Sequence, residues 1–177
     1  QSEKYQWMFV ASYSARPKDI DTWNENARNL IKYYNAYALC ENDEMSFINY
    51  MIYKGDGHYL ADQPGWLKEI VPNTSVNRKK GIHRSSGKIR DYLDGILKKY
   101  LDEVINVEKA DDGSVLSETL GVSRVLDPML LEEIIRFDKD GNFDRVIAAE
   151  LAIALAEHMT PQIRVGNLDI DHRIESL

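Results

Sequence analysis

The chain has 177 residues, of which 44% are hydrophobic and 29% are charged, and its formal net charge at pH 7 is −7. This length can bury a substantial core, and the composition is ordinary for a soluble protein. No apolar run approaches the roughly 20 residues that span a membrane. The single cysteine, Cys40, excludes an intrachain disulfide framework and indicates a reducing compartment such as the cytoplasm.

The first half of the chain alternates strand-like and helix-like segments. Aromatic and β-prone residues at 5–14 predict a strand, which Pro17 closes. Apolar residues at helical spacing predict a helix that Asp19 or Asp21 caps and that runs through Tyr34. The further elements predicted in this half are a buried strand at 36–40, a helix at 44–53 and a short strand at 59–60. This alternation is typical of α/β layered domains, so we predict an α/β fold.

The second half is predicted to be mainly helical. Ser85 or Ser86 is expected to cap a helix that reaches about Ile105 and carries one apolar stripe. Asp127-Pro128 starts another helix with proline in its first turn, and a final apolar helix begins at 142–143. The predicted division of the chain is a domain at 1–158, with a basic loop at 70–90 and a linker at 106–117, followed by a C-terminal tail at 159–177.

Two acidic residues stand where buried structure is expected to end. Glu41 follows the apolar run 36–40, and Asp144 opens the last helix, whose apolar part spans 146–156. Only the fold can bring two such carboxylates together, and carboxylates that face one another usually hold a divalent metal. Oxygen ligands in a chain without a Cys/His constellation favour Mg²⁺ or Mn²⁺ over Zn²⁺. The pattern therefore predicts a candidate nuclease with Glu41 and Asp144 as catalytic and metal-binding residues.

Each of these carboxylates also has a purely structural interpretation. Asp144 can be an ordinary helix-start aspartate, which the helix dipole favours. Glu41 can cap the following helix, although the two residues after it serve that purpose equally well. Auxiliary metal ligands are predicted in the segment before the last helix, at Asp138 and Asp140. That segment also fits a plain Asp-Gly turn, because it lacks the later glutamate of a calcium-binding loop.

One segment of this acidic chain is strongly basic. No acidic residue occurs between Ile70 and Arg90. The predicted DNA-binding residues in this segment are Arg78, Lys79, Lys80, His83, Arg84 and Lys88. Such a segment can follow a phosphate backbone while the acidic remainder of the chain holds metal. The alternative is a solvated loop and helix start, because runs of charge usually form solvated faces.

Several motifs, taken in order, resemble a known family. They are Glu41-Asn42 after an apolar strand, Gly81-Ile82 with the helix start Arg84-Ser85-Ser86, and Gly141-Asn142-Phe143-Asp144-Arg145-Val146 before an alanine-rich helix. Over roughly 5–158 the chain resembles the C-terminal nuclease domain of the large subunit of tailed-phage terminases, the motors that package viral DNA. Ala15-Arg16-Pro17 and the approach Tyr33-Tyr34-Asn35-Ala36 fit the same pattern.

The resemblance implies an RNase H-like fold, with a mixed sheet flanked by helices, and an endonuclease (a hydrolase) that needs Mg²⁺ or Mn²⁺. Glu41 matches the family's second acid and Asp144 its acid near the last helix. Many members have paired aspartates at the latter position, where this chain has Phe143 first. The family's first acid belongs to a strand before residue 5, so we expect the N-terminal strand and the ATPase domain to be missing from this sequence. The fragment is then expected to be weak or inactive alone.

The implied substrate is concatemeric double-stranded DNA, which such enzymes cut during packaging of a bacteriophage or prophage genome in the host cytoplasm. The implied partners of the full protein are the portal and the small terminase subunit, with no membrane. An alternative is an RNase H-like scaffold that docks to the portal or the small subunit without cutting. A third interpretation, an α/β protein unrelated to DNA, predicts that Glu41 and Asp144 lie far apart.

Overall fold

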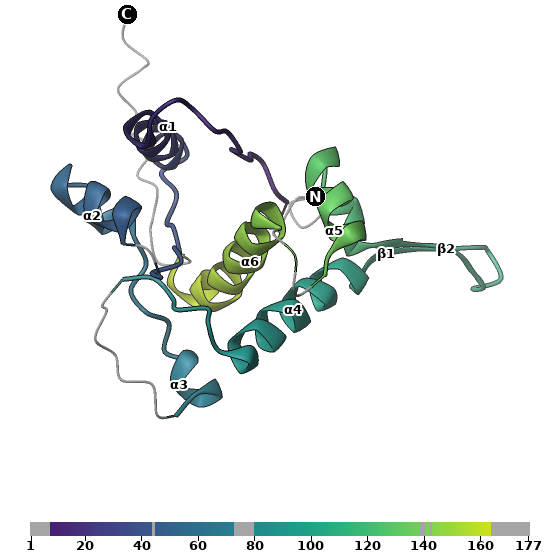
Figure 1. Cartoon of the computed structure of the whole chain (residues 1–177). Coiled ribbons are helices and arrows are strands. Elements are labelled where there is room, and N and C mark those ends of the chain that lie inside the picture. The colour runs from purple at the N-terminus through teal and green to yellow at the C-terminus, as the bar shows by residue number, and fades with distance from the viewer. Residues whose placement is uncertain (1–7, 44, 73–79, 139–140, 142, 164–177) are drawn as a thin grey trace, which may run out of the picture.

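The computed structural model describes residues 8–43, 45–72, 80–138, 141 and 143–163, with side chains as far as residue 159. The α-helices in these ranges are α1 (Ile20–Tyr33), α2 (Ser46–Tyr53), α3 (Leu67–Ile70), α4 (Gly87–Asp102), α5 (Pro128–Arg136) and α6 (Asp144–Ile163). Strands β1 (Val104–Lys109) and β2 (Val115–Leu120) pair as a two-stranded antiparallel sheet. Short 3₁₀ helices, η2 and η3, span Gly57–Tyr59 and Gly121–Arg124. The predicted mixture of α and β structure is confirmed at this level (Figure 1).

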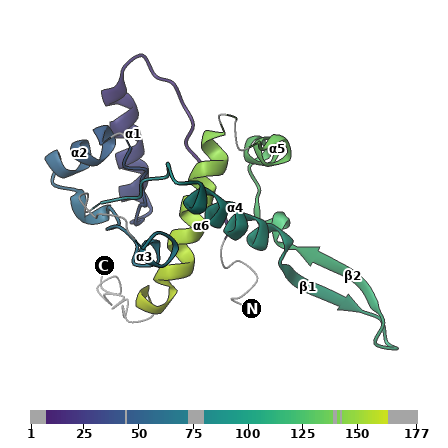
Figure 2. The ribbon, with the colours of Figure 1, turned by 60° about the horizontal axis from the view of Figure 1, so that its bottom comes forward.

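The main hydrophobic core lies where α4 packs on α6, which passes through the middle of the molecule in both views (Figures 1 and 2). Leu93 of α4 and Val146 and Ala154 of α6 are completely buried. Burying a leucine or valine side chain stabilises the fold by about 1.5–3 kcal/mol. A second, smaller cluster packs Ile48 and Met51 of α2 against buried apolar neighbours. Helices α3 and α5 pack on the α4–α6 pair, whereas α2 packs in the second cluster.

Helix starts follow the predicted capping signals. Asp19 caps α1, and its carboxylate accepts a 2.7 Å hydrogen bond from the backbone N–H of Thr22. Asp127 caps α5 in the same way, with Pro128 in the first turn. Ser86 stands at the N-cap position of α4 as predicted, but its side chain makes no capping hydrogen bond. The helix ends before the predicted limit because the chain enters β1 at Val104. The last helix continues beyond residue 158 to residue 163, past the predicted start of the tail.

The strand predicted at 5–14 is wrong for the residues that the structure describes, since 8–14 form no helix or strand. Strand residues need a neighbouring strand to pair their backbone groups, and in the described ranges no strand pairs with this segment. The aromatic residues pack instead. The Phe9 ring contacts the Tyr100 ring edge-on at a centroid distance of 5.7 Å, which holds the segment against the core.

The strand predicted at 36–40 is represented by isolated parallel bridges. Ala38 pairs with Leu60, and Glu41 pairs with Ile82. The backbone N–H of Ala38 donates a 2.8 Å hydrogen bond to the carbonyl of Tyr59. The backbone N–H of Ile82 donates one of the same length to the carbonyl of Cys40. The segments at 38–42, 60–62 and 80–82 therefore lie side by side, with Glu41 at the end of the first.

The linker predicted at 106–117 is wrong, because these residues belong to the β1–β2 hairpin. Gly113 adopts a left-handed conformation (φ +84°) in the connection, and its N–H donates to the carbonyl of Ala110 at 2.9 Å. An Asp-Gly pair between β-branched segments is a strong hairpin signal. The hairpin projects away from the helices in both views (Figures 1 and 2).

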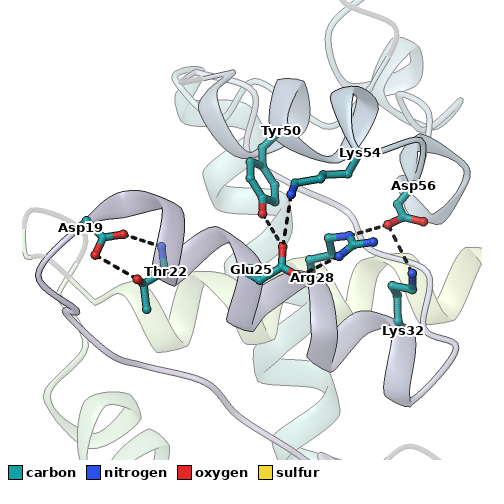
Figure 3. A network of polar contacts seen from close by, with 8 residues as sticks. All are labelled: Asp19, Thr22, Glu25, Arg28, Lys32, Tyr50, Lys54 and Asp56. Atoms are coloured by element: carbon teal, nitrogen blue, oxygen red, sulfur yellow. Dashed lines mark hydrogen bonds and ion pairs between the residues drawn. The ribbon is translucent and has the colours of Figure 1, made fainter.

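A polar network joins α1 to α2 and to the loop after α2 (Figure 3). Arg28 of α1 lies 2.5 Å from Asp56 and 2.8 Å from Glu25. Tyr50 of α2 donates a hydrogen bond to Glu25, and this bond is the main cause that raises the pKa of the Tyr50 hydroxyl to about 12. The Arg28 guanidinium lowers the pKa of the Asp56 carboxyl. The polar faces of these two helices are thus matched in charge.

A substitution at Gly81 tests whether the close packing of the segments at 38–42 and 80–82 contributes to stability. The φ of Gly81 is +77°, and a Cβ at this position would lie 2.4 Å from the carbonyl oxygen of Cys40. We expect Gly81→Ala to lower the free energy of unfolding by roughly 1–3 kcal/mol, through strain and steric conflict. Gly95→Ala is the matched control, because a Cβ at Gly95 in α4 meets no atom within 4 Å; it should stabilise the protein by about 0.5–1 kcal/mol. Urea denaturation measures both, and equal midpoints would contradict this account.

Candidate functional site

A cavity of about 560 Å³ lies between the N-terminal segment, α5 and α6. Its size falls within the roughly 300–1,000 Å³ of small-molecule sites. The charged residues that line it are Arg16, Asp127, Glu133, Asp144 and Arg145. The sequence analysis singles out Asp144 but misses Asp127 and Glu133, whose helix-capping and helical positions carry no separate signal for a cavity. One predicted catalytic residue, Asp144, therefore lines this cavity.

Asp144 is the first residue of α6, and its exposed side chain lines the cavity. Ala148 and Ala152 follow at four-residue intervals and also line the cavity, so one face of the helix borders it. In the part of the chain that the structure describes, no side chain hydrogen-bonds or ion-pairs with Asp144. Among the described residues the carboxylate thus has no side-chain partner, and it stands at the helix end where the dipole favours negative charge.

The other two acids of the cavity are already engaged. Asp127 caps α5 and accepts a 2.5 Å hydrogen bond from the Ser12 hydroxyl, which is the largest cause of its lowered pKa. Glu133 accepts a 3.0 Å hydrogen bond from the backbone N–H of Arg145 and pairs with the same residue's guanidinium. Arg145 follows Asp144 directly, so the Glu133 contacts fix the start of α6 beside the cavity.

Glu41 lies elsewhere, at the end of the paired segment 38–42. Its side chain is exposed and makes no hydrogen bond or ion pair with the described residues, and Glu41 is not among the residues that line the cavity. The neighbouring Asn42 is buried, and its Nδ2 donates to the carbonyl of Lys80 at 2.9 Å. The backbone at Glu41 is therefore held firmly by its neighbours while the carboxylate faces solvent.

The predicted metal ligands do not form a metal site by themselves. Within the described ranges no group of three or more His, Cys, Asp or Glu side chains could hold a metal ion. Asp138 is exposed in the loop before α6, where its carbonyl accepts a 3.0 Å hydrogen bond from Gly141, and Asp140 lies outside the described residues. Glu41 and Asp144 thus offer two separate carboxylates, fewer than a divalent ion takes from a dedicated protein site.

A buried ion pair connects the segment next to Glu41 with the helix that begins at Asp144. Arg84 Nη2 lies 2.6 Å from Glu150 Oε2, and the Glu150 side chain is fully buried. Burial raises the pKa of the Glu150 carboxyl to about 7; the Arg84 guanidinium opposes this shift, and a hydrogen bond with Asp94 of α4 adds to it. Sequence reasoning misses this cluster, and the only signal for it is a glutamate within the apolar run of the last helix.

Several of the predicted DNA-binding side chains already form hydrogen bonds or ion pairs with other residues of the chain. Lys80 donates to the carbonyl of Leu60 and pairs with Asp62, each at 2.8 Å. His83 pairs with Asp43, and its ring lies 2.9 Å from the Ser85 hydroxyl. Arg84 is buried against Glu150. Lys88 is exposed on the first turn of α4. The remaining two predicted residues, Arg78 and Lys79, lie outside the described residues.

In comparisons with protein-family models, with curated proteins and with solved structures, nothing matches this chain. No helix in the described part of the chain is long and apolar enough to cross a membrane.

The Glu150 cluster predicts a pH-dependent stability. Burial raises the pKa of the Glu150 carboxyl to about 7, whereas an unperturbed glutamate has a pKa of about 4.3. Between these two values the folded state binds more protons than the unfolded state, so stability falls as the pH rises. The full effect is on the order of 3 kcal/mol.

We expect Glu150→Gln to remove this dependence, since the glutamine is neutral and can still accept a hydrogen bond from Arg84. Glu157→Gln, at an exposed position of the same helix that lies 3.2 Å from Lys99, is the matched control and should keep the wild-type slope. Urea unfolding at intervals from pH 4.5 to 7.5 measures the three proteins. The account fails if wild type and Glu150→Gln show the same slope.

Proposed function

We propose that this chain is the nuclease domain of a viral DNA-packaging terminase, a metal-dependent endonuclease with an RNase H-like core that cuts concatemeric double-stranded DNA. The resemblance of its motifs to that family supports the proposal. The parallel bridges at Ala38–Leu60 and Glu41–Ile82 also support it, because parallel pairing in a small α/β domain is typical of a sheet covered by helices. In this proposal Glu41 and Asp144 are the catalytic acids.

The observation that carries the proposal is the buried Arg84–Glu150 pair, which joins the surroundings of the two acids. Ile82 pairs with Glu41, and Arg84 follows it by two residues. Glu150 follows Asp144 by six residues on one helix, which is about 9 Å of helix length. The Glu41 and Asp144 carboxylates form no hydrogen bond or ion pair with described residues. The segments that carry them are connected by this one buried contact.

Mg²⁺ or Mn²⁺ bound at such carboxylates would lower the pKa of a water molecule and stabilise negative charge on the phosphate. Two carboxylates are too few for a two-metal site, so the described residues alone do not account for one. The proposal therefore needs further ligands, with Asp138 and Asp140 as the predicted ones. Asp144 would act as a ligand at the helix start, and the Glu133–Arg145 contacts would keep it in position.

The DNA would approach along the segment that leads into α4. Lys88 and Arg90 are exposed there, and the positive end of the helix dipole adds to the attraction for phosphate. Arg78 and Lys79 are the further predicted contacts. Arg84 is a predicted DNA-binding residue, but it is buried against Glu150. We therefore assign it a structural role, in which it holds the basic segment against α6.

A second candidate function is an RNase H-like scaffold that docks to the portal or to the small terminase subunit without cutting. The observation that favours it is the projecting hairpin, whose apolar side chains are exposed. The two candidates differ in whether Asp144 and Glu41 are needed for an activity on DNA.

Plasmid cleavage in the presence of Mn²⁺ tests the proposal. We expect slow cutting by the wild type and a loss of more than about 100-fold in Asp144→Asn and Glu41→Gln. The reason is that even residues behind the metal ligands cost 10–100-fold when changed. Glu69→Gln, at an exposed position of α3, is the control and should cut like the wild type.

Two results would contradict the nuclease. One is cutting that persists in Asp144→Asn and Glu41→Gln, which would assign the activity to other residues or to a contaminant. The other is the absence of cutting by all four proteins, both with Mn²⁺ and with Mg²⁺. That second result would favour the docking scaffold.

A further inference from the structure

The β1–β2 hairpin exposes apolar side chains along its whole length. Every residue of β1 is exposed, and so is every residue of β2 except the half-buried Thr119. The exposed fraction reaches 54% for Val115 and 68% for Leu116. A two-stranded hairpin alone is marginally stable in water and usually needs a third strand or a helix on its apolar face. The described residues supply no such cover for this one.

The strand register places the apolar residues on one face. Asn106 pairs with Thr119 and Glu108 pairs with Ser117, so these four polar side chains share one face. Side chains alternate between the two faces along each strand, and the register shifts at the two ends of β1 interrupt this alternation. When both are taken into account, the apolar residues lie on the opposite face. The apolar residues of that face are Val104, Ile105, Val107, Val115, Leu116 and Leu120. Two charged residues share it, Glu118 opposite Val107 and Lys109 opposite Val115.

The two irregularities in the register make the apolar face larger. At each of them one strand has an additional residue, so two consecutive side chains point to the same face. The consecutive residues are Val104 with Ile105, and Val115 with Leu116. The opposite face is polar, and its Ser117 hydroxyl donates a 2.9 Å hydrogen bond to Glu108. The hairpin is therefore amphipathic although it stands apart from the core.

The root of the hairpin is held rigidly, so the apolar face has a fixed direction. Arg124 Nη2 donates to the carbonyl of Tyr100 and to Glu103, each at 2.7 Å, and the guanidinium stacks 4.0 Å above the Tyr100 ring. Gly121, where β2 ends, donates its N–H to the carbonyl of Glu103 at 2.7 Å. A side chain at Gly121 would collide with the carbonyl of Tyr100. Such preorganisation reduces the entropy lost on binding.

The charge of the hairpin indicates the kind of partner. Residues 104–120 contain four acids and one lysine, a formal charge of −3. On the apolar face itself Glu118 is balanced by Lys109, which pairs with Val115. The net negative charge therefore comes from Asp111 and Asp112 at the tip and from Glu108 on the polar face. Asp112 is bound by the Ser114 hydroxyl at 2.6 Å, and this hydrogen bond lowers its pKa, so its charge persists into acidic solution.

We propose that this apolar face is a docking surface for a second protein, which presents an apolar patch rimmed by lysine and arginine. Complementary charge around an apolar centre is the usual arrangement of specific interfaces. Double-stranded DNA is disfavoured because a hairpin of charge −3 repels phosphate. A second copy of this chain would bring two hairpins of like charge together. This proposal does not depend on whether the chain cuts DNA. If the chain is instead the docking scaffold proposed above, the apolar face of the hairpin is the surface that docks.

A pair of synthetic peptides tests the proposal on the whole chain. Both are amphipathic helices with the same leucine stripe, which is flanked by lysines in one and by glutamates in the other. Fluorescence anisotropy of the labelled peptides measures binding at low and high salt. We expect the lysine peptide to bind at least about tenfold more tightly, with an advantage that high salt reduces.

Variants of the chain locate the binding. The double variant Val107→Thr/Leu116→Thr keeps β-branched residues in the strands and should weaken the lysine peptide by about tenfold or more. Asn106→Thr/Ser117→Thr on the polar face is the control and should bind like the wild type. Asp111→Asn/Glu118→Gln removes charge without touching the apolar residues, so it tests the charge even if the first variant loses its fold. It should reduce the preference for the lysine peptide.

The proposal is overturned if the two peptides bind equally, if neither binds, or if the control weakens binding as much as the apolar-face variant. It is also overturned if sedimentation shows a dimer that the apolar-face variant dissociates, since the occupant is then a second copy. Direct binding of labelled duplex DNA to the wild type that is lost in the apolar-face variant would likewise contradict it. Plasmid cleavage by the same variants should be unchanged, which separates this proposal from that of the nuclease.

Discussion

The buried ion pair between Arg84 and Glu150 is the contact on which the arrangement of the site depends. It ties the loop before α4 to the middle of α6, and Asp94 of α4 shares the same polar pocket. Losing Glu150 would leave the buried Arg84 guanidinium without this partner, and removing one member of a buried pair typically costs about 3–5 kcal/mol. A polar contact within an apolar interface also limits how α4 and α6 can pack, because a shifted packing would separate Arg84 from Glu150.

Helix positions could be predicted because their signals are local. The carboxylates of Asp19 and Asp127 accept hydrogen bonds from N–H groups two or three residues away, and sequence spacing alone identifies such pairs. The N-terminal strand could not be predicted correctly, because a strand is defined by a partner that the sequence does not name. Phe9 is equally consistent with a strand and with a loop that packs on Tyr100. The hairpin could have been predicted from the sequence, because Asp112-Gly113 stands between two segments rich in β-branched residues.

The candidate site could be predicted in part, for the same reason. Asp144 at a helix start is a local pattern, and the structure places it on a cavity. The partner of Arg84 was beyond sequence reasoning, since 66 residues separate it from Glu150 and nothing marks one member of a basic run as buried. The engagement of Asp127 by Ser12 spans 115 positions and was equally hidden. Local patterns indicate which residues are special, whereas tertiary contacts decide which of them remain free.

The order in which the chain is synthesised gives the α4–α6 pairing a further consequence. The buried face of α4 ends near Tyr100, whereas the residues of α6 that cover it begin at Val146. Ribosomes add roughly 5–20 residues per second, so the face emerges several seconds before its cover, on the order of 2–10 s. During that interval the hairpin, whose contacts are local, can already form within microseconds. The nascent chain thus exposes the apolar face of α4 beside a hairpin that is only marginally stable, a form that chaperones are suited to protect until the last helix emerges.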